Sequence, residues 1–274
     1  MIKQLEEEII RNINNIPQVP LSMFLSGGID SSLVLALVRK VYPQLPIFTF
    51  SLARSNTYPD IIFARKIAKR FKTEHTELIL SENEYREYLK KYNRIKKYDF
   101  KGDVNIFILC SMAKNFSKQI ITGDGGDECF GGYWLHKYPL GHKESGAIKS
   151  FVEIHPSPKK HIEEMVKLGY RGFYYKENPT TSDYDAVWEY FIEIMAPRHL
   201  APLRHISNAL NVTTHTPLFS ENLVNSMRLL PYQERIDRKI ERDLAVKYLP
   251  KTIIERKSIG FDLALEKKSF YDLI

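Results

Sequence analysis

The sequence has 274 residues, of which 43% are hydrophobic and 27% are charged, and its formal net charge is +7. This composition supports a sizeable core, in one large domain or in a domain with a smaller helical appendage, and does not favour disorder. No run of about 18 apolar residues occurs, so we expect no membrane span, and the charged N-terminus does not resemble a signal peptide. Two cysteines make no disulfide framework. We therefore expect a cytoplasmic protein.

The excess positive charge is scattered along the chain. Basic pairs such as Lys69-Arg70, Lys96-Lys97 and Lys267-Lys268 lie far apart, and no basic stripe is interleaved with aromatic residues. Scattered lysines usually form a solvated surface, whereas binding of single-stranded nucleic acid needs aromatic side chains beside the basic ones. A nucleic-acid partner is therefore not favoured.

Strands and helices alternate through the first half of the chain. Helices are predicted from hydrophobic residues at helical spacing, and strands from short apolar runs. In chain order these are a helix at 2–15, a strand at 21–25, a helix at 31–41, a strand at 47–50, a helix at 59–71, a strand at 77–80, a helix opened by a capping box at Ser81, a helix at 104–116 and a strand at 119–122. This alternation predicts an α/β fold, with a doubly wound, mostly parallel sheet between flanking helices.

The second half is predicted to be mostly helical. Helices are expected at 188–195, 203–210, 221–230 and 239–248, with prolines as boundaries at Pro197, Pro202, Pro217, Pro231 and Pro250. Residues 139–185 are ambiguous and are not assigned. We expect a division into an α/β core over 1–135 and a mostly helical extension of the same domain over 136–274.

The first candidate site is Ser26-Gly27-Gly28-Ile29-Asp30-Ser31-Ser32, between a strand and a helix. Glycines let the backbone approach an anion, and the helix N-terminus and the serine hydroxyls add donors. Asp30 suits a Mg²⁺ that bridges phosphate oxygens. The simpler interpretation is a turn in which Asp30 or Ser31 caps the helix. The pattern is neither a Walker A loop nor the dinucleotide fingerprint.

The second candidate site is the segment from Thr122 to Tyr133, with five glycines around Asp124, Asp127 and Glu128. In a parallel sheet, ligands bind at the carboxyl ends of the strands near the switch in strand order. Both glycine-rich segments follow strands, so Asp127 could share a Mg²⁺ with Asp30. The alternative, an acidic loop without a ligand, is not favoured in so basic a chain.

The first loop resembles the pyrophosphate loop (PP-loop) of the ATP pyrophosphatases, which have an adenine nucleotide alpha hydrolase-like fold. Together with Gly123-Asp124-Gly125-Gly126-Asp127-Glu128 and Phe130-Gly131-Gly132-Tyr133, it is similar to the synthetase half of the asparagine synthetase family. Weaker likenesses are Phe48-Thr49-Phe50-Ser51, Pro217-Leu218-Phe219, Leu249-Pro250 and Arg256-Lys257-Ser258-Ile259-Gly260-Phe261. The resemblance extends over most of the chain, and it implies that residues 1–135 form the nucleotide-binding core and that residues 136–274 form the acceptor-side extension of the same domain.

The resemblance implies a role for each matching residue. Ser26, Gly27, Gly28, Ser31 and Ser32 would hold the pyrophosphate, Asp30 and Asp127 would bind Mg²⁺, and Leu25, Phe50, Ser51 and Gly123 would line the adenosine pocket. Asp124 and Lys257 would be the catalytic residues. ATP and Mg²⁺ are the implied cofactors.

The sequence departs from the family pattern at four places. It starts with Met1-Ile2 and has no cysteine in second place, so we expect no glutaminase half. Asp124 replaces the family's glutamate, and the family's lysine position falls on Ser258, with Lys257 one residue earlier. Thr213-Thr214-His215 replaces the usual Glu-x-Arg; a lone histidine such as His215 is more often structural than functional.

The resemblance thus implies a ligase that adenylates a carboxylate, aspartate or a related acceptor, and forms an amide with ammonia or an amine, with loss of pyrophosphate. The partners that this implies are a small-molecule carboxylate and an ammonia or amine donor, and any ammonia would come from solution or from a separate glutaminase subunit. The alternatives are a lactam- or peptide-cyclising synthetase of the same family, a degenerate ATP-binding module, and a tRNA-modifying pyrophosphatase. The thiolating members of that last class need paired catalytic cysteines, whereas Cys110 and Cys129 are expected in the core.

Overall fold

A computed structural model describes the chain except for residues 99–101, 134–135, 137–163, 165–166, 168–180 and 257–274. The chain divides into two compact units. The first unit comprises residues 1–124, 199–223 and 242–274, and the second comprises residues 125–198 and 224–241. The division of the sequence at residue 135 into a core and an acceptor-side extension stays a prediction.

The first unit is built on a five-stranded parallel sheet with the order β3-β2-β1-β4-β5. The strands are β1 (Leu21–Phe24), β2 (Ile47–Ala53), β3 (Glu74–Ile79), β4 (Gln119–Ile121) and β5 (Thr213–His215). The central strand β1 pairs with β2 on one side and β4 on the other, with Phe24 opposite Phe50 and Met23 opposite Ile121. The strand order therefore reverses beside β1, which confirms the predicted doubly wound parallel sheet.

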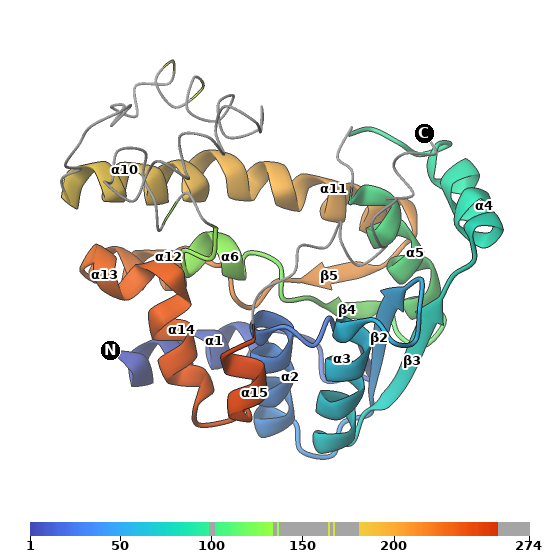
Figure 1. Cartoon of the computed structure of the whole chain (residues 1–274), viewed down its shortest axis with the longest axis horizontal. Helices are drawn as coiled ribbons and strands as arrows, with labels where there is room; N and C mark the ends of the chain where they lie inside the picture. The colour runs from blue at the N-terminus through green and yellow to red at the C-terminus, as the bar shows by residue number, and fades with distance from the viewer. Residues whose placement is uncertain (99–101, 134–135, 137–163, 165–166, 168–180, 257–274) are drawn as a thin grey trace. The chain divides into compact units, whose positions relative to one another are not determined.

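Helices cover both faces of this sheet, as right-handed crossovers require. The elements on one face are α1 (Ile2–Asn14), α2 (Ile29–Val41) and α3 (Pro59–Arg70), and those on the other include α4 (Glu82–Tyr92) and α5 (Asp103–Ala113) (Figure 1). The α5 face encloses an apolar cluster to which Phe50 of β2 and Tyr85 of α4 contribute. The predicted helices and strands of the first half are all present, with ends that differ by a few residues.

The residues at which α4 and β3 begin can be explained from their local sequences. The predicted capping box at Ser81 is confirmed, because its hydroxyl accepts from the Glu84 N–H and Glu84 in turn accepts from the Ser81 N–H. Strand β3 begins three residues earlier than predicted, at Glu74. It lies at the sheet edge, where polar side chains are tolerated, so its first half lacks the apolar signal of a buried strand.

The second half corrects one expectation about prolines. Helix α10 (Thr181–Tyr190) is followed by a π-helical segment, η2 (Phe191–Met195), and directly by α11 (Ala196–Ala209), so Pro197 and Pro202 do not end helices. The N–H of Ala196 bonds to the Phe191 carbonyl five residues back, a wider turn. A π-bulge rearranges the backbone bonding around it, and packing then compensates for the bond that each proline cannot make.

The remaining helices are short. They are α6 (Gly126–Cys129), α12 (Glu221–Arg228), α13 (Tyr232–Arg235), the 3₁₀ turn η3 (Ile236–Arg238), α14 (Lys239–Ala245) and α15 (Lys251–Ile254). Within the second unit, Val187, Tyr190, Phe191 and Met195 form an apolar cluster. Trp188 is also buried there and its indole N–H donates to the Cys129 carbonyl at 3.0 Å.

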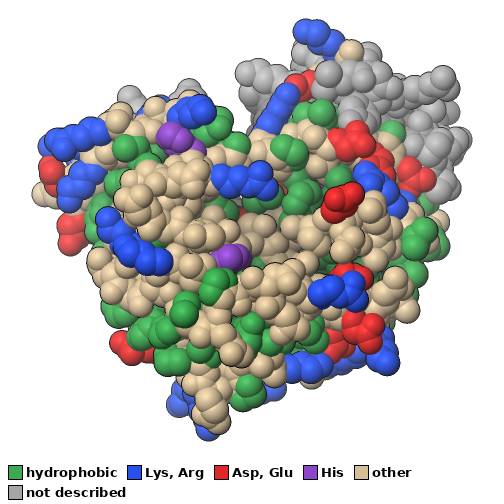
Figure 2. Space-filling model, turned by 180° about the vertical axis from the view of Figure 1, so that it is seen from behind, with side chains coloured by type: hydrophobic (Ala, Val, Ile, Leu, Met, Phe, Trp, Pro, Cys, Tyr) green, Lys and Arg blue, Asp and Glu red, His purple; other side chains and the backbone are tan. Residues whose placement is uncertain are grey.

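The surface agrees with the scattered basic residues of the sequence. On the face drawn in Figure 2, Lys and Arg side chains are dispersed among acidic and uncharged ones and form no continuous band over the described residues. Among the helices that the structure describes, none combines the length and the apolar character needed to cross a bilayer.

Candidate nucleotide-binding site

The serine- and glycine-rich loop leaves the carboxyl end of β1 at the switch point of the sheet. The backbone continues the strand for one residue, since the Leu25 N–H donates to the Phe50 carbonyl at 2.9 Å. Gly27 then takes a left-handed conformation with φ +70°, and Gly28 is the N-cap of α2. Helix α2 runs for 13 residues from Ile29, so its N-terminal N–H groups and its dipole lie at the loop. This is the strand–turn–helix arrangement that binds anions.

Serine hydroxyls stabilise the turn from inside. Ser31 Oγ accepts from the Ser26 N–H at 3.2 Å and lies 3.0 Å from Ser26 Oγ, and Ser26 Oγ accepts from the Gly28 N–H. No side chain caps α2, so the interpretation of Asp30 or Ser31 as the helix cap is wrong. The hydroxyl of Ser32 is buried and has no hydrogen-bond partner among the described residues. The backbone and the Ser26–Ser31 pair therefore shape the loop.

The second glycine-rich segment meets this loop inside the first unit. A Cβ on Gly123 would lie 2.8 Å from the backbone N of Ser31 and 3.1 Å from Cβ of Asp30. Only glycine permits this approach, because real Cβ atoms do not come within 3.0 Å of such neighbours. The ends of β1 and β4 therefore converge as expected, and Asp30 and Gly123 are neighbours.

The residues expected at adenosine are placed by the sheet. The side chain of Phe50 is buried in the α5-side cluster and meets Phe116 edge-on with ring centroids 5.2 Å apart, and Leu25 is also buried. Ser51 Oγ donates to the Leu25 carbonyl at 2.6 Å. These side chains belong to the core, so any ligand contact from Leu25 or Phe50 must come from main-chain atoms.

A histidine that the sequence did not single out lies beside Ser51. His75 of β3 contacts Ser51 Oγ through Nε2 at 3.3 Å and Thr49 Oγ1 through Nδ1 at 2.9 Å. Burial is the largest influence on the pKa of His75 and lowers it, so the ring is neutral at pH 7. A neutral imidazole can accept at one nitrogen and donate at the other, which suits two hydroxyl neighbours.

Two acidic residues of the first unit stand near the loop. Asp30 lies in the first turn of α2, and the N–H of Asp124 donates to Thr122 Oγ1 at 3.3 Å. The described residues contain no group of three or more His, Cys, Asp or Glu side chains placed to hold a metal. Mg²⁺ is usually held by only one or two carboxylates together with phosphate oxygens and water. A carboxylate at the mouth of an anion loop, such as Asp30, fits that chemistry.

Asp127 lies in the second unit, where an arginine holds it. It belongs to the short helix α6, and its carboxylate forms an ion pair with the guanidinium of Arg238. The Arg238 side chain is 7% exposed and also donates to the buried Glu241 at 3.3 Å, whereas that of Asp127 is 38% exposed. Asp127 is thus oriented by a buried cation while part of its carboxylate faces solvent.

The glycines at the end of the signature segment explain how Arg238 is placed. The carbonyls of Phe130 and Gly131 accept from the N–H groups of Arg238 and Asp237, each at 3.0 Å. A Cβ on Gly131 would lie 2.5 Å from the Arg235 carbonyl, and one on Gly132 would lie 1.9 Å from Oδ1 of Asp127. Gly131 and Gly132 therefore form a docking surface for the backbone of 235–238.

Other candidate residues of the sequence are accounted for as follows. His215 bonds to the Gln119 side chain at 2.7 Å, as a structural histidine would. Cys110 and Cys129 are fully buried; burial raises the pKa of Cys110 to about 12 and also raises that of Cys129. Neither thiol is therefore a nucleophile at neutral pH. Lys257 and the rest of the C-terminal motif, Ser258 to Phe261, lie outside the described residues.

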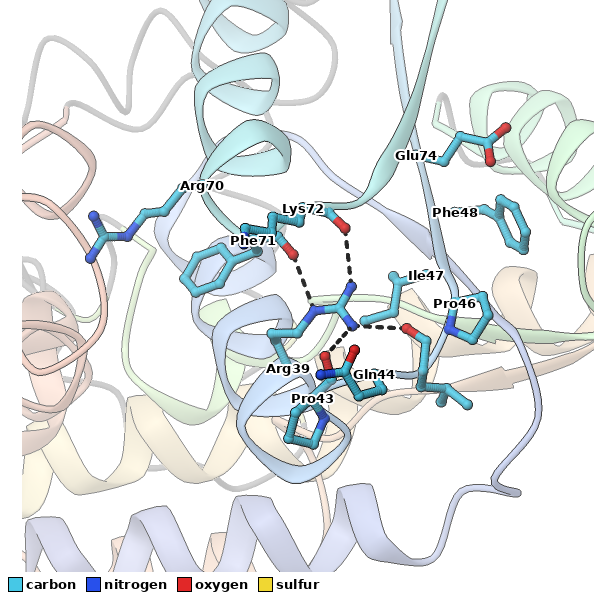
Figure 3. Close-up of a pocket in the computed structure, with 11 residues that line it drawn as sticks. Arg39, Pro43, Gln44, Pro46, Ile47, Phe48, Arg70, Phe71, Lys72 and Glu74 are labelled. Carbon is cyan, nitrogen blue, oxygen red and sulfur yellow. Dashed lines mark hydrogen bonds between the residues drawn. The ribbon is translucent and has the colours of Figure 1, made fainter.

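A cavity of about 550 Å³ lies at the opposite, amino ends of β2 and β3 (Figure 3). Arg39 at its centre donates to backbone carbonyls of Leu45, Pro43 and Phe71 at 2.8 to 3.1 Å, with longer contacts to two others. Burial lowers the pKa of Arg39. A guanidinium whose donors are used by carbonyls closes the turn between α2 and β2 and is not a ligand site.

A doubly wound parallel sheet with a serine- and glycine-rich loop at its switch point defines a nucleotide-binding α/β protein. The sequence matches the family model for asparagine synthase over residues 14–273. The chain therefore belongs to the asparagine synthase family.

The curated relatives include an asparagine synthetase (glutamine-hydrolysing) of Bacillus subtilis, 26% identical over 63% of this chain and 27% of the relative. A protein of Methanocaldococcus jannaschii described as a second asparagine synthetase (glutamine-hydrolysing) is 36% identical over 43% of this chain and 23% of its own length. The matches thus span about a quarter of these relatives. Among solved structures, an NMN synthetase from Francisella tularensis is 16% identical, with a TM-score of 0.36, over 93% of this chain and 90% of its own.

Proposed function

We propose that this protein is an ATP-dependent carbon–nitrogen ligase that adenylates a carboxylate and transfers the acyl group to ammonia or an amine. The observation that carries the proposal is the loop after β1, where Gly27 and Gly28 open the backbone and α2 begins at Ile29. Such a loop grips the β- and γ-phosphates through N–H groups. Membership of the asparagine synthase family supports ATP as the nucleotide.

Because the loop holds the β- and γ-phosphates, the α-phosphate stays open to attack, and this determines the proposed reaction. A carboxylate oxygen of the substrate attacks the α-phosphorus, the bond to the β-phosphate oxygen breaks, and pyrophosphate leaves with the electron pair. The amine nitrogen then attacks the acyl carbon, and AMP leaves as the amine loses a proton. Both steps need positioning and charge stabilisation more than covalent participation by the protein.

Each residue is proposed either to position the substrates or to stabilise charge. The pyrophosphate is held by Ser26, Gly27, Gly28, Ser31 and Ser32, and adenosine by main-chain atoms of Leu25, Phe50, Ser51 and Gly123. Asp124 offers a carboxylate to the incoming nitrogen, and Lys257 a cation to the charge that develops on the adenylate. Mg²⁺, when bound, offsets charge on the pyrophosphate, and Asp30 and Asp127 are its proposed ligands.

The substrate is proposed to be aspartate or a related carboxylate, and the proposed nitrogen source is ammonia or a separate glutaminase subunit. The test is ATP–pyrophosphate exchange with Mg²⁺, screened over aspartate, other carboxylates and peptides, first with ammonium and then with glutamine. We expect exchange with at least one carboxylate, and AMP with pyrophosphate as products. ADP as the sole nucleotide product would refute the proposal, because it would place the attack on the γ-phosphate.

A further inference from the structure

A row of polar side chains crosses β2 and β3 on one face of the sheet. Thr49 of β2 lies opposite His75 of β3, and Ser51 lies opposite Glu77. Phe50, between them in β2, packs into the α5-side cluster, so Thr49 and Ser51 point to the other face. The side chain of His75 is 9% exposed, and Thr49 and Ser51 are buried. Buried polar groups need hydrogen-bond partners, and here the direction of each bond can be worked out.

The single proton of the Ser51 hydroxyl determines which nitrogen of His75 carries hydrogen. Ser51 Oγ lies 2.6 Å from the Leu25 carbonyl, which can only accept, so the proton of Ser51 is used there. Toward His75 Nε2, 3.3 Å away, Ser51 Oγ must then accept. Nε2 therefore carries the hydrogen, and in the neutral ring Nδ1 accepts from Thr49 Oγ1 at 2.9 Å. Thr49 Oγ1 in turn accepts from Thr73 Oγ1, also at 2.9 Å.

The carboxylate of Glu77 does not compete with Ser51 for the His75 proton. Its Oε1 is 4.0 Å from Nε2, which is too far for a hydrogen bond. Its two oxygens accept instead from Arg65 of α3 at 2.7 and 2.8 Å. The opposite tautomer of His75 would require the Ser51 proton to turn from the Leu25 carbonyl to Nε2. That change would exchange a 2.6 Å contact for one of 3.3 Å.

This chain of hydrogen bonds ends on the first peptide group of the nucleotide loop. The Leu25 carbonyl and the Ser26 N–H belong to one planar peptide group. Its carbonyl accepts from Ser51, and its N–H donates to Ser31 Oγ at 3.2 Å, in the first turn of α2. Hydrogen bonds that point the same way along such a chain polarise and strengthen one another. The bonds from β3 therefore continue through the peptide into α2.

Helix α3 fixes a later residue of the loop by direct contact. A Cβ on Gly27 would be 2.5 Å from the backbone N of Ala64 and 2.8 Å from the carbonyl carbon of Phe63. These neighbours are helical backbone atoms that cannot rotate away as a side chain can. The loop is thus held at Gly27 by packing, whereas the orientation of its first peptide depends on the hydrogen bonds at its two ends.

We propose that His75 is a positioning residue: as the Nε2–H tautomer it holds the Ser51 hydroxyl on the Leu25 carbonyl and so sets the orientation of the first loop peptide. The proposal rests on the proposed function in one respect, the binding of ATP phosphates by this loop. His75 lies two strands away from β1 and acts only through Ser51. Without the donor at Nε2, the Ser51 hydroxyl can turn away from Leu25, and the loop then binds phosphates less tightly.

The test measures the tautomer, the loop peptide and ATP binding separately, each in the full chain. Isotope-edited NMR of the histidine rings identifies the protonated nitrogen of His75, whose signals are those lost in the His75→Gln variant. Hydrogen exchange of the Ser26 amide reports on the first loop peptide. Calorimetry with Mg²⁺ and ATP measures the affinity. We expect the wild type to show the Nε2–H tautomer at neutral pH.

The variants differ in whether a donor remains at the position of Nε2. His75→Gln places an amide there, whereas His75→Asn reaches only the position of Nδ1 and is the matched control; His75→Leu removes both groups. We expect His75→Asn and His75→Leu to speed Ser26 exchange and to weaken ATP binding, each at least about tenfold. His75→Gln should stay within about threefold of the wild type.

A double-mutant cycle tests whether His75 acts through Ser51. Ser51→Ala removes the hydroxyl that His75 holds, and the main-chain atoms of Ser51 stay in place. We expect Ser51→Ala to weaken ATP binding as much as His75→Leu does. The double variant should bind ATP no more weakly than Ser51→Ala alone, because two members of one chain of hydrogen bonds are not additive.

Each other outcome has a definite meaning. An Nδ1–H tautomer, or additive losses in the double variant, overturns the proposal and leaves the proposed function intact. Unchanged Ser26 exchange and ATP affinity in His75→Leu do the same. If the wild type does not bind ATP but His75→Leu speeds Ser26 exchange, the proposed function fails and the role of His75 in the loop stands. If His75→Leu does not fold, equal losses in His75→Gln and His75→Asn overturn the proposal.

Discussion

The substitution Gly27→Ala tests whether the loop is packed against α3 as described. Gly27 has φ +70°, a conformation that costs any residue with a Cβ about 1–2 kcal/mol. The new methyl group would also lie 2.5 Å from the backbone N of Ala64, so the loop or the helix must move. Overpacking of this kind typically costs about 1–3 kcal/mol. Together these effects destabilise the protein by about 2–5 kcal/mol.

The assay is thermal unfolding, followed by calorimetric titration with Mg²⁺ and ATP. For a chain of this size, each kcal/mol lowers the Tm by roughly 2–4 °C, so Gly27→Ala should melt about 4–20 °C below the wild type. The matched control is Gly28→Ala. Gly28 has φ −78°, and its added Cβ would lie 3.2 Å from Ser26 Oγ alone, the end of a side chain that can rotate.

We expect Gly28→Ala to melt within about 2 °C of the wild type, because a surface-like change usually alters stability by about 0.5 kcal/mol or less. Gly27→Ala should also bind ATP more weakly, since the loop that holds the phosphates is displaced. Equal melting temperatures for the two variants would show that α3 does not restrict the loop at Gly27.

Three further predictions concern charge and burial. Burial alone would raise the pKa of Glu6, but hydrogen bonds from Lys40 and Lys247 lower it to about 2. Glu6→Gln should therefore lose stability that the wild type has above pH 4.5, about 1–2 kcal/mol after screening of the half-exposed lysines. Urea unfolding should show this difference between the two proteins vanish as the pH falls from 4.5 to 2. Asp30→Ala should weaken ATP binding at least about tenfold with Mg²⁺ and much less in EDTA, as titrations of both forms would show; equal losses would remove Asp30 from the metal site. Cys110, with a pKa of about 12, should react with iodoacetamide at least about a hundredfold more slowly in the native protein than in urea, a ratio that rapid native labelling would contradict.

The strands and helices that carry the pyrophosphate loop were predictable because their signals are local. Strand β1 is a short buried run bounded by a glycine turn, and α2 has apolar residues along its length. Strand β5 gave no such signal: Thr213–His215 is short and polar, and it is a strand only because it pairs with β4. The sequence predicts a boundary at Pro202 because isolated helices avoid proline, a preference that packing overrides in α11.

The candidate site was predictable where residue type and neighbours in the sequence decide the chemistry. Gly123 beside Ser31 follows from the topology of a parallel sheet, since β1 and β4 end at the same edge. The partner of Asp127 could not be found in this way. Arg238 lies 111 residues away, on a turn whose left-handed residues, Asp237 and Arg238 itself, follow no hydrophobic period. Only a tertiary fold brings such a pair together.

The docking of residues 235–238 on Gly131 and Gly132 couples the sequence changes that two distant segments of the chain can accept. Any side chain at Gly131 meets the Arg235 carbonyl, and any at Gly132 meets the Asp127–Arg238 pair. A change on either side therefore requires a compensating change on the other, or the loss of both. Substitutions in one segment are therefore tolerated only together with matching substitutions in the other. A chimera that joins residues 125–132 of this protein to a C-terminal half from a distant relative should fold poorly unless residues 235–238 are transferred with them.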